Sequence, residues 1–93
     1  MAWVLPLKFM TLDQAVEHIA YRILAISHAG SLLDQESVRQ LQELGFIRGE
    51  EVVLLRRTQP GSDPLVVRIG SSTFALRKAE AQCIQIEEEI VHA

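Results

Sequence analysis

The sequence has little cysteine: Cys83 is the single one, so an intramolecular disulfide framework is excluded. No Cys/His spacing of the zinc-finger kind accompanies it. A lone thiol fits a reducing compartment, and we therefore predict a cytoplasmic protein. Because Cys83 stands at the start of a short apolar run, we expect it to be a small, half-buried core residue rather than a metal ligand.

An excess of positive charge is also absent. The formal net charge is -3, and the surplus carboxylates lie largely in Glu87, Glu88 and Glu89. Binding to a phosphate backbone requires a basic field that such a chain does not supply. We therefore expect no nucleic-acid partner.

Long apolar runs are missing too. The opening MAWVLPLKFM is interrupted by Pro6 and Lys8 and has no basic segment ahead of it, so it does not resemble a signal peptide. No other stretch approaches the roughly 20 uninterrupted apolar residues that cross a bilayer. We expect no direct membrane insertion; a role at a membrane would require docking onto a protein already there.

Catalytic and nucleotide-binding motifs are absent as well. Ser27 and His28 are sequence neighbours at the end of a predicted strand, and adjacent strand residues point to opposite faces, so they do not form a nucleophile and base at a telling spacing. The glycines form neither a GxxxxGK nor a GxGxxG pattern. We therefore predict no enzymatic activity, no nucleotide binding and no cofactor.

What remains is a chain of ordinary globular composition, with 93 residues, 48% hydrophobic and 23% charged. This length is enough for one compact core and too short for two domains of ordinary size. We predict a single domain over residues 1–93, with its core at about 10–87 and disorder only at the ends.

The clearest helix is predicted after Asp34, a well-placed N-cap. Val38, Leu41 and Leu44 then recur at helical spacing up to Gly45, which is expected in the left-handed conformation just past the helix end.

The residues after that helix predict a tight turn. Phe46 can fold back onto Leu41 as the hydrophobic contact of a Schellman motif, and Gly49 closes the turn. A strand is expected to follow directly.

Alternating apolar residues predict five short strands, at residues 19–27, 51–58, 65–69, 73–76 and 83–87. In the first strand, we expect Ile19, Tyr21 and Ile23 on one face, and Leu24 and Ile26 on the other.

Shorter sequence patterns predict the segments that connect these strands. Thr11 can cap a short helical segment within residues 10–18, and residues 78–82 predict a single helical turn. The sequence QPGSDP, which ends in Asp63 and Pro64, predicts a wide hairpin. Because a flat sheet of this size would leave its edges exposed, we predict a mainly β fold curled into a small five-stranded barrel with one inserted helix.

Two segments carry a family resemblance: LQELGFIRGEEVVLLRR at residues 41–57, and GSDPLVVRIGSSTFALRKAEAQCIQIE at residues 61–87. Their order of helix end, turn glycine, strand, Gly-Asp-Pro hairpin, ALR strand and acidic-alanine turn resembles the FeoA family. The match runs from about Met10 to Glu87.

This resemblance implies an SH3-like barrel and a non-enzymatic accessory role in bacterial ferrous iron uptake, in the cytoplasm. The partner it implies is FeoB, a membrane permease with a cytoplasmic GTP-binding domain; modulation of its activity is an open question. The same fold occurs as a C-terminal module of iron-dependent repressors, but 93 residues leave no room for their helix-turn-helix.

The chain departs from the family pattern in two turns. Glu17 and His18 stand where relatives usually have a glycine-containing turn, and Arg48 stands where they usually have proline. We expect loop conformation and partner contacts to differ from those of relatives mainly at these two turns.

Apolar residues flanking the helix are the first candidates for partner binding. They are Leu32, Leu33, Phe46 and Ile47. They either fasten the helix to the barrel or form the rim of a docking groove.

Arginines on neighbouring strands are the second candidates. Arg56 and Arg68 fall on successive predicted strands and can share an outer face with others among Arg57, Arg77 and Lys78. They form either a solvated exterior paired with acidic residues such as Glu50 and Glu51, or a face for an acidic partner.

Metal binding is the main alternative function. A specific Fe(II) or zinc site needs three or four converging ligands, whereas His18 and His28 only bracket one predicted strand. We expect no intrinsic metal site; divalent metal bound adventitiously or between molecules is the alternative. Three alternative hypotheses remain: a metal-responsive protein, a general SH3-like adaptor and self-association. The adaptor hypothesis is the weakest on composition, because one Trp, one Tyr and three Phe are few aromatics for a peptide-binding groove.

Overall fold

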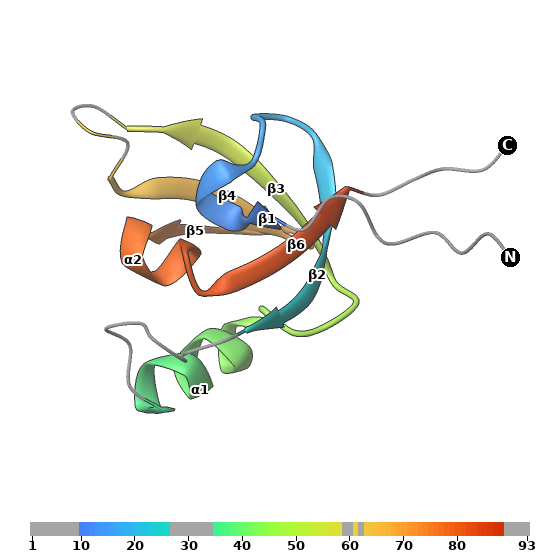
Figure 1. Ribbon diagram of the computed structural model, residues 1–93, viewed down its shortest axis with the longest axis vertical. Coiled ribbons are helices and arrows are strands. Elements are labelled where there is room, and N and C mark those ends of the chain that lie inside the picture. The colour runs from blue at the N-terminus through green and yellow to red at the C-terminus, as the bar shows by residue number, and fades with distance from the viewer. Residues whose placement is uncertain (1–9, 27–34, 59–60, 62, 89–93) are drawn as a thin grey trace, which may run out of the picture.

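The computed structural model describes residues 10–26, 35–58, 61 and 63–88 (Figure 1). Its elements are β1 (Met10–Thr11), the 3₁₀ turn η1 (Leu12–Gln14), β2 (Ala20–Ile26), α1 (Gln35–Leu44), β3 (Glu51–Arg57), β4 (Leu65–Ile69), β5 (Ser72–Leu76), α2 (Lys78–Ala81) and β6 (Ile84–Glu88). The five predicted strands and the main helix are confirmed, and the two-residue β1 is added. Asp34, the predicted N-cap, lies outside the described residues.

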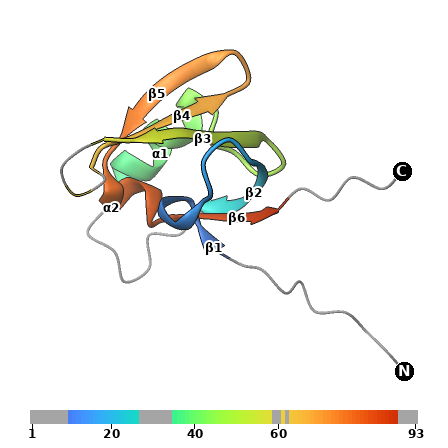
Figure 2. The same cartoon turned by 90° about the horizontal axis from the view of Figure 1, so that it is seen from above.

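These strands form one antiparallel sheet in the order β1-β6-β2-β3-β4-β5. The sheet curls so that β3, β4 and β5 lie on one side of the molecule and β2, β6 and β1 on the other (Figure 2). The core between them is built from side chains that are almost fully buried. They include Leu12, Tyr21, Ile23, Leu41, Phe46, Val52, Leu54, Leu65, Val67, Ile84 and Ile86.

The end of α1 has the predicted Schellman geometry. Gly45 has a φ of 116°, its N–H donates to the Gln42 carbonyl at 3.1 Å, and the Phe46 N–H donates to the Leu41 carbonyl at 3.0 Å. Phe46 is completely buried. Of the three apolar residues at helical spacing, Val38 and Leu41 are buried, whereas Leu44 is exposed, because each three-residue step falls about 60° short of a full turn and carries Leu44 away from the core side.

A β-bulge changes the predicted faces of β2. Tyr21 and Ile23 point into the core as expected, but the pairing with β6 shifts register between Ile23 and Ala25. The extra residue reverses the alternation, so Ile26 also packs against the core. The expectation that Ile26 lies on the opposite face from Ile23 is therefore wrong, and Ile19 lies in the exposed turn before the strand.

The N-terminal helical segment is shorter than predicted. Thr11 precedes η1, and its N–H donates to Gln14 Oε1 at 3.1 Å. Because Met10 and Thr11 pair with β6 as a strand, the helical part is limited to three residues.

The predicted turn residues hold loops to the barrel. The Gly49 N–H donates to the Ile23 carbonyl at 2.8 Å, and Gly49 has a φ of 91°. Asp63, next to Pro64, accepts a hydrogen bond from the Lys78 N–H at 3.0 Å, which joins the hairpin loop to α2.

Candidate docking surface

Arg56 and Arg68 lie together on the outer face of β3 and β4, and we call this pair the arginine face. Arg68 is opposite Val53, and Arg56 is opposite Val66, with a register shift at Leu55 between them. Both arginines are exposed, and within the described part of the chain the side chain of neither forms a hydrogen bond or an ion pair. The shared outer face is therefore present, and these two side chains do not have the pairing to Glu50 or Glu51 that was one of the two alternatives.

Arg57 has a structural role instead. Its backbone N–H donates to Glu17 Oε2 at 3.0 Å, and its Nη2 donates to the Ala15 carbonyl at 2.7 Å. The Val16 N–H donates to the buried Tyr21 hydroxyl at 3.0 Å. The two Arg57 contacts fix the turn before β2 against β3, and sequence alternation could not show them because they join residues about 40 positions apart. The Val16–Tyr21 bond is local and holds the turn to the start of β2.

Two apolar side chains are exposed where α1 turns into β3. Ile47 is 46% exposed, as a docking residue requires, and Leu44, in the last turn of α1, is 47% exposed. Of the two alternatives for Phe46, the docking rim is wrong, because its ring packs inside the barrel with its centroid 5.7 Å from that of Phe74. Phe46 fastens the helix to the barrel. Leu32 and Leu33 lie outside the described residues.

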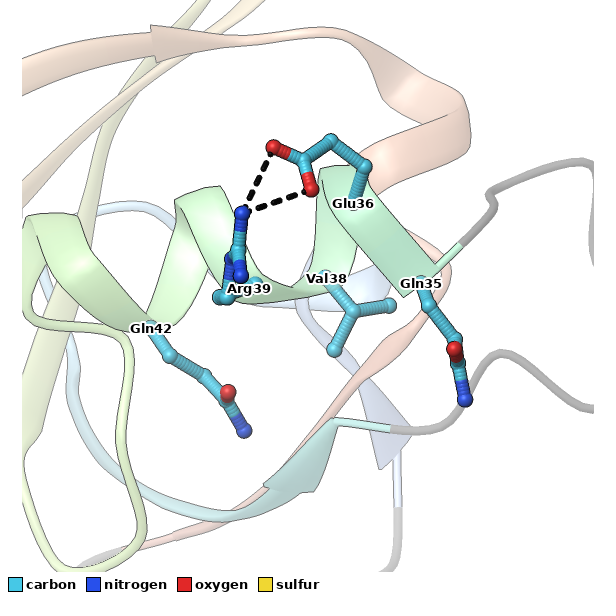
Figure 3. Close-up of a pocket in the computed structure, with 5 residues that line it drawn as sticks. All are labelled: Gln35, Glu36, Val38, Arg39 and Gln42. Atoms are coloured by element: carbon cyan, nitrogen blue, oxygen red, sulfur yellow. Dashed lines mark hydrogen bonds and ion pairs between the residues drawn. The ribbon is translucent and has the colours of Figure 1, made fainter.

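A shallow groove follows one side of α1 (Figure 3). Its lining is mostly polar, and Glu36 and Arg39 neutralise each other in an exposed ion pair of 2.9 Å. An exposed pair of this kind contributes little to stability and leaves no net charge for a ligand. This groove therefore attracts a charged partner less strongly than the arginine face does.

The family model described as the FeoA domain matches residues 10–88. The chain belongs to the FeoA family. This family is implicated in ferrous iron transport, and the predicted family membership and SH3-like, mainly β fold are confirmed. A search among curated proteins found no significant match.

Solved FeoA proteins have the same fold. FeoA from Stenotrophomonas maltophilia, an SH3-domain protein solved with zinc and described as a candidate activating factor of ferrous iron transport, is 33% identical; the match covers 84% of this chain and 89% of that one, with a TM-score of 0.70. Iron(II) transport protein A from Clostridium thermocellum is 32% identical over 85% of this chain, with a TM-score of 0.73, and the match spans 45% of its length.

A regulator also shares the fold. A manganese-dependent transcriptional repressor has a TM-score of 0.74 over 87% of this chain and 42% of its own, at 21% identity. At that identity the likeness concerns the fold alone.

The metal candidates do not converge in the described part of this FeoA-family chain. His18 is exposed and has a φ of 68°, and His28 lies outside the described residues. Among the described residues there is no cluster of three or more His, Cys, Asp or Glu side chains that could hold a metal ion. Cys83 is 3% exposed, and its Sγ lies 3.4 Å from the Ala79 carbonyl, so it is a core residue and more deeply buried than expected.

None of the helices in the described part of the chain has the length and hydropathy to span a bilayer.

Proposed function

We propose that this chain is a non-catalytic accessory protein of bacterial ferrous iron uptake, and that it docks in the cytoplasm onto the soluble part of a FeoB-type GTPase permease. The observation that supports this is the FeoA-domain match over residues 10–88, together with similarity to FeoA from Stenotrophomonas maltophilia. The proposal assigns no resident cofactor to the chain.

The docking surface in this proposal contains the arginine face and Ile47. Arg56 and Arg68 present unpaired positive charge, and Ile47 presents apolar area. Charged groups of this kind increase the rate and specificity of association with an acidic surface, and an exposed aliphatic side chain adds area that can be buried.

The test is binding to the permease's purified cytoplasmic domain, with GTP hydrolysis recorded in parallel at matched salt. The double variant Arg56→Gln with Arg68→Gln is expected to weaken binding at least about fivefold. Arg39→Gln, which removes one exposed positive charge on α1, is the control and is expected to leave affinity unchanged.

Each outcome has a distinct meaning. A saturable change in the hydrolysis rate would identify a regulatory module, and binding without a rate change would identify a scaffold. Absence of binding by the folded protein would overturn the proposal. An anaerobic calorimetric titration with Fe(II) would then test the metal-responsive alternative, in which His18 is a ligand.

A further inference from the structure

Strand β5 forms one edge of the sheet. Within the described residues it pairs with β4 alone, and Figure 2 shows it as the outermost strand on its side of the molecule. An edge strand presents unpaired backbone N–H and C=O groups, which can pair with a strand from another chain.

The hairpin register identifies which backbone groups are open. Ile69 pairs with Ser72 across a two-residue turn in which Gly70 has a φ of 58°, and the closing pair of such a turn exchanges both of its hydrogen bonds. The bonding alternates along the strand, so the N–H and C=O groups of Thr73 and Ala75 point away from β4. Both residues are exposed, and nothing in the described part of the chain forms a hydrogen bond with these outward N–H and C=O groups.

The strand itself carries none of the residues that usually protect a sheet edge against strand addition. The sequence of β5, STFAL, contains no charged residue and no proline. Phe74, on the inner side between the two open positions, is partly exposed and offers an apolar contact. The strand is therefore suited to pairing with an extended segment that alternates apolar and polar side chains.

The outer face beside this edge is cationic. Arg68 is directly opposite Thr73, and Arg56 lies two strands from Ala75, across Val66. Glu51, the carboxylate at the far end of this face in β3, is opposite Arg22 of β2. The two rows of outer side chains are Val53, Arg68 and Thr73, and Arg56, Val66 and Ala75.

We propose that β5 accepts an extended acidic segment of a partner protein as an added strand, with carboxylates at alternate positions on the side of the arginine face. Adjacent strands are about 4.8 Å apart, so a carboxylate opposite Thr73 lies within side-chain reach of Arg68 across that small residue. A carboxylate opposite Ala75 is three strand spacings, about 14 Å, from the backbone of Arg56, so screening leaves it a weaker attraction than the carboxylate beside Arg68 has. The inward side chains of the segment would lie beside Phe74.

Charge distinguishes this occupant from a second copy of the chain. Two copies paired through β5 could have their arginine faces on the same side of the joint sheet, which would bring like charges together. If the faces lay on opposite sides, each would remain without a counter-charge from the other copy. An acidic segment instead supplies carboxylates beyond β5, where the two outer rows end in the uncharged residues Thr73 and Ala75. The inference rests on the proposed docking function, and it specifies β5 as the sheet edge that binds and an acidic extended segment as the partner.

The experiment uses the full chain and a synthetic peptide, Thr-Val-Glu-Val-Glu-Val-Thr, with a matched peptide in which lysine replaces both glutamates. Nuclear magnetic resonance is expected to show amide shifts and slower hydrogen exchange at Thr73 and Ala75 on addition of the glutamate peptide. The Phe74 amide, which already bonds to β4, should be protected with and without peptide. The lysine peptide should bind at least about tenfold more weakly.

Two variants separate backbone pairing from charge. Ala75→Pro removes an N–H that only an added strand would use and is tolerated at a sheet edge, so peptide binding should fall at least about tenfold. Arg68→Gln should weaken binding of the glutamate peptide about threefold or more and leave the lysine peptide unaffected or bound more tightly. Arg39→Gln is the charge control.

Binding of the glutamate peptide at wild-type affinity by a folded Ala75→Pro variant, or no shifts at Thr73 and Ala75 at millimolar peptide, would overturn the inference. Sedimentation showing that β5 is already paired in a homodimer of the free protein would also overturn it. The permease measurement stays separate: permease binding without peptide binding overturns this inference alone, and peptide binding without permease binding overturns the proposed function alone.

Discussion

Arg56 and Arg68 share the outer face of the sheet because one extra residue interrupts the alternation of β3. Leu54 lies opposite Val67 in the core, and Arg56 lies opposite the next residue, Val66, with Leu55 as the residue of the β-bulge. Without the shift, Leu55 would take the outer position and Arg56 would be directed into the barrel. The candidate docking surface therefore depends on a local irregularity.

Gly45 is expected to be the least replaceable glycine of the α1–β3 turn. Its φ of 116° is unfavourable for any L side chain, and an added Cβ would lie 3.3 Å from Ile69 Cγ2. Gly45→Val should lower the free energy of unfolding by about 1–3 kcal/mol, measured by urea denaturation. Gly49→Val, also at positive φ but with open space around it, is the matched control and should cost less. Equal losses would show that the contact with Ile69 is unimportant.

His18 is expected to tolerate glycine. It has a φ of 68°, which favours glycine, and its exposed side chain forms no hydrogen bond within the described residues. His18→Gly should leave stability unchanged or raise it by up to about 1 kcal/mol in thermal unfolding. Glu17→Gly, one residue earlier, removes the acceptor of the Arg57 N–H and should destabilise. A large loss in His18→Gly would assign its imidazole a role.

Phe46 and Ile47 are expected to behave oppositely although they are neighbours. Phe46→Ala removes a fully buried ring and should cost about 3–5 kcal/mol in free energy of unfolding. Ile47→Ala removes a side chain that is 46% exposed and should stay within about 1 kcal/mol of the parent. Chemical denaturation of both variants checks this, and similar losses would contradict the assignment of Phe46 to the core and Ile47 to the surface.

The Tyr21 hydroxyl is expected to hold the turn before β2. It accepts the Val16 N–H at 3.0 Å, so Tyr21→Phe keeps the buried ring and removes the acceptor. The free energy of unfolding should fall by about 1 kcal/mol, with faster hydrogen exchange at the Val16 amide. Unchanged exchange at Val16 would mean that this bond does not restrain the turn.

The sequence by itself determined the strands, the main helix and its end. Strand positions follow from alternation, as Val52 and Leu54 or Ile84 and Ile86 show, since each pair is spaced by two and buried. The helix end follows from a local rule, because Gly45 and Phe46 satisfy their carbonyl partners within the same turn. Such features depend on neighbours in the chain, and the sequence displays them directly.

The tertiary structure alone decided which side chains are free to meet a partner. The bulges in β2 and β3 arise from pairing with other strands, and they placed Ile26 in the core and Arg56 outside. Burial of Phe46 depends on the barrel interior, where its ring packs beside Phe74, 28 positions later in the chain. The open edge at β5 likewise exists only once the order of strands is fixed, because it depends on which strands remain unpaired.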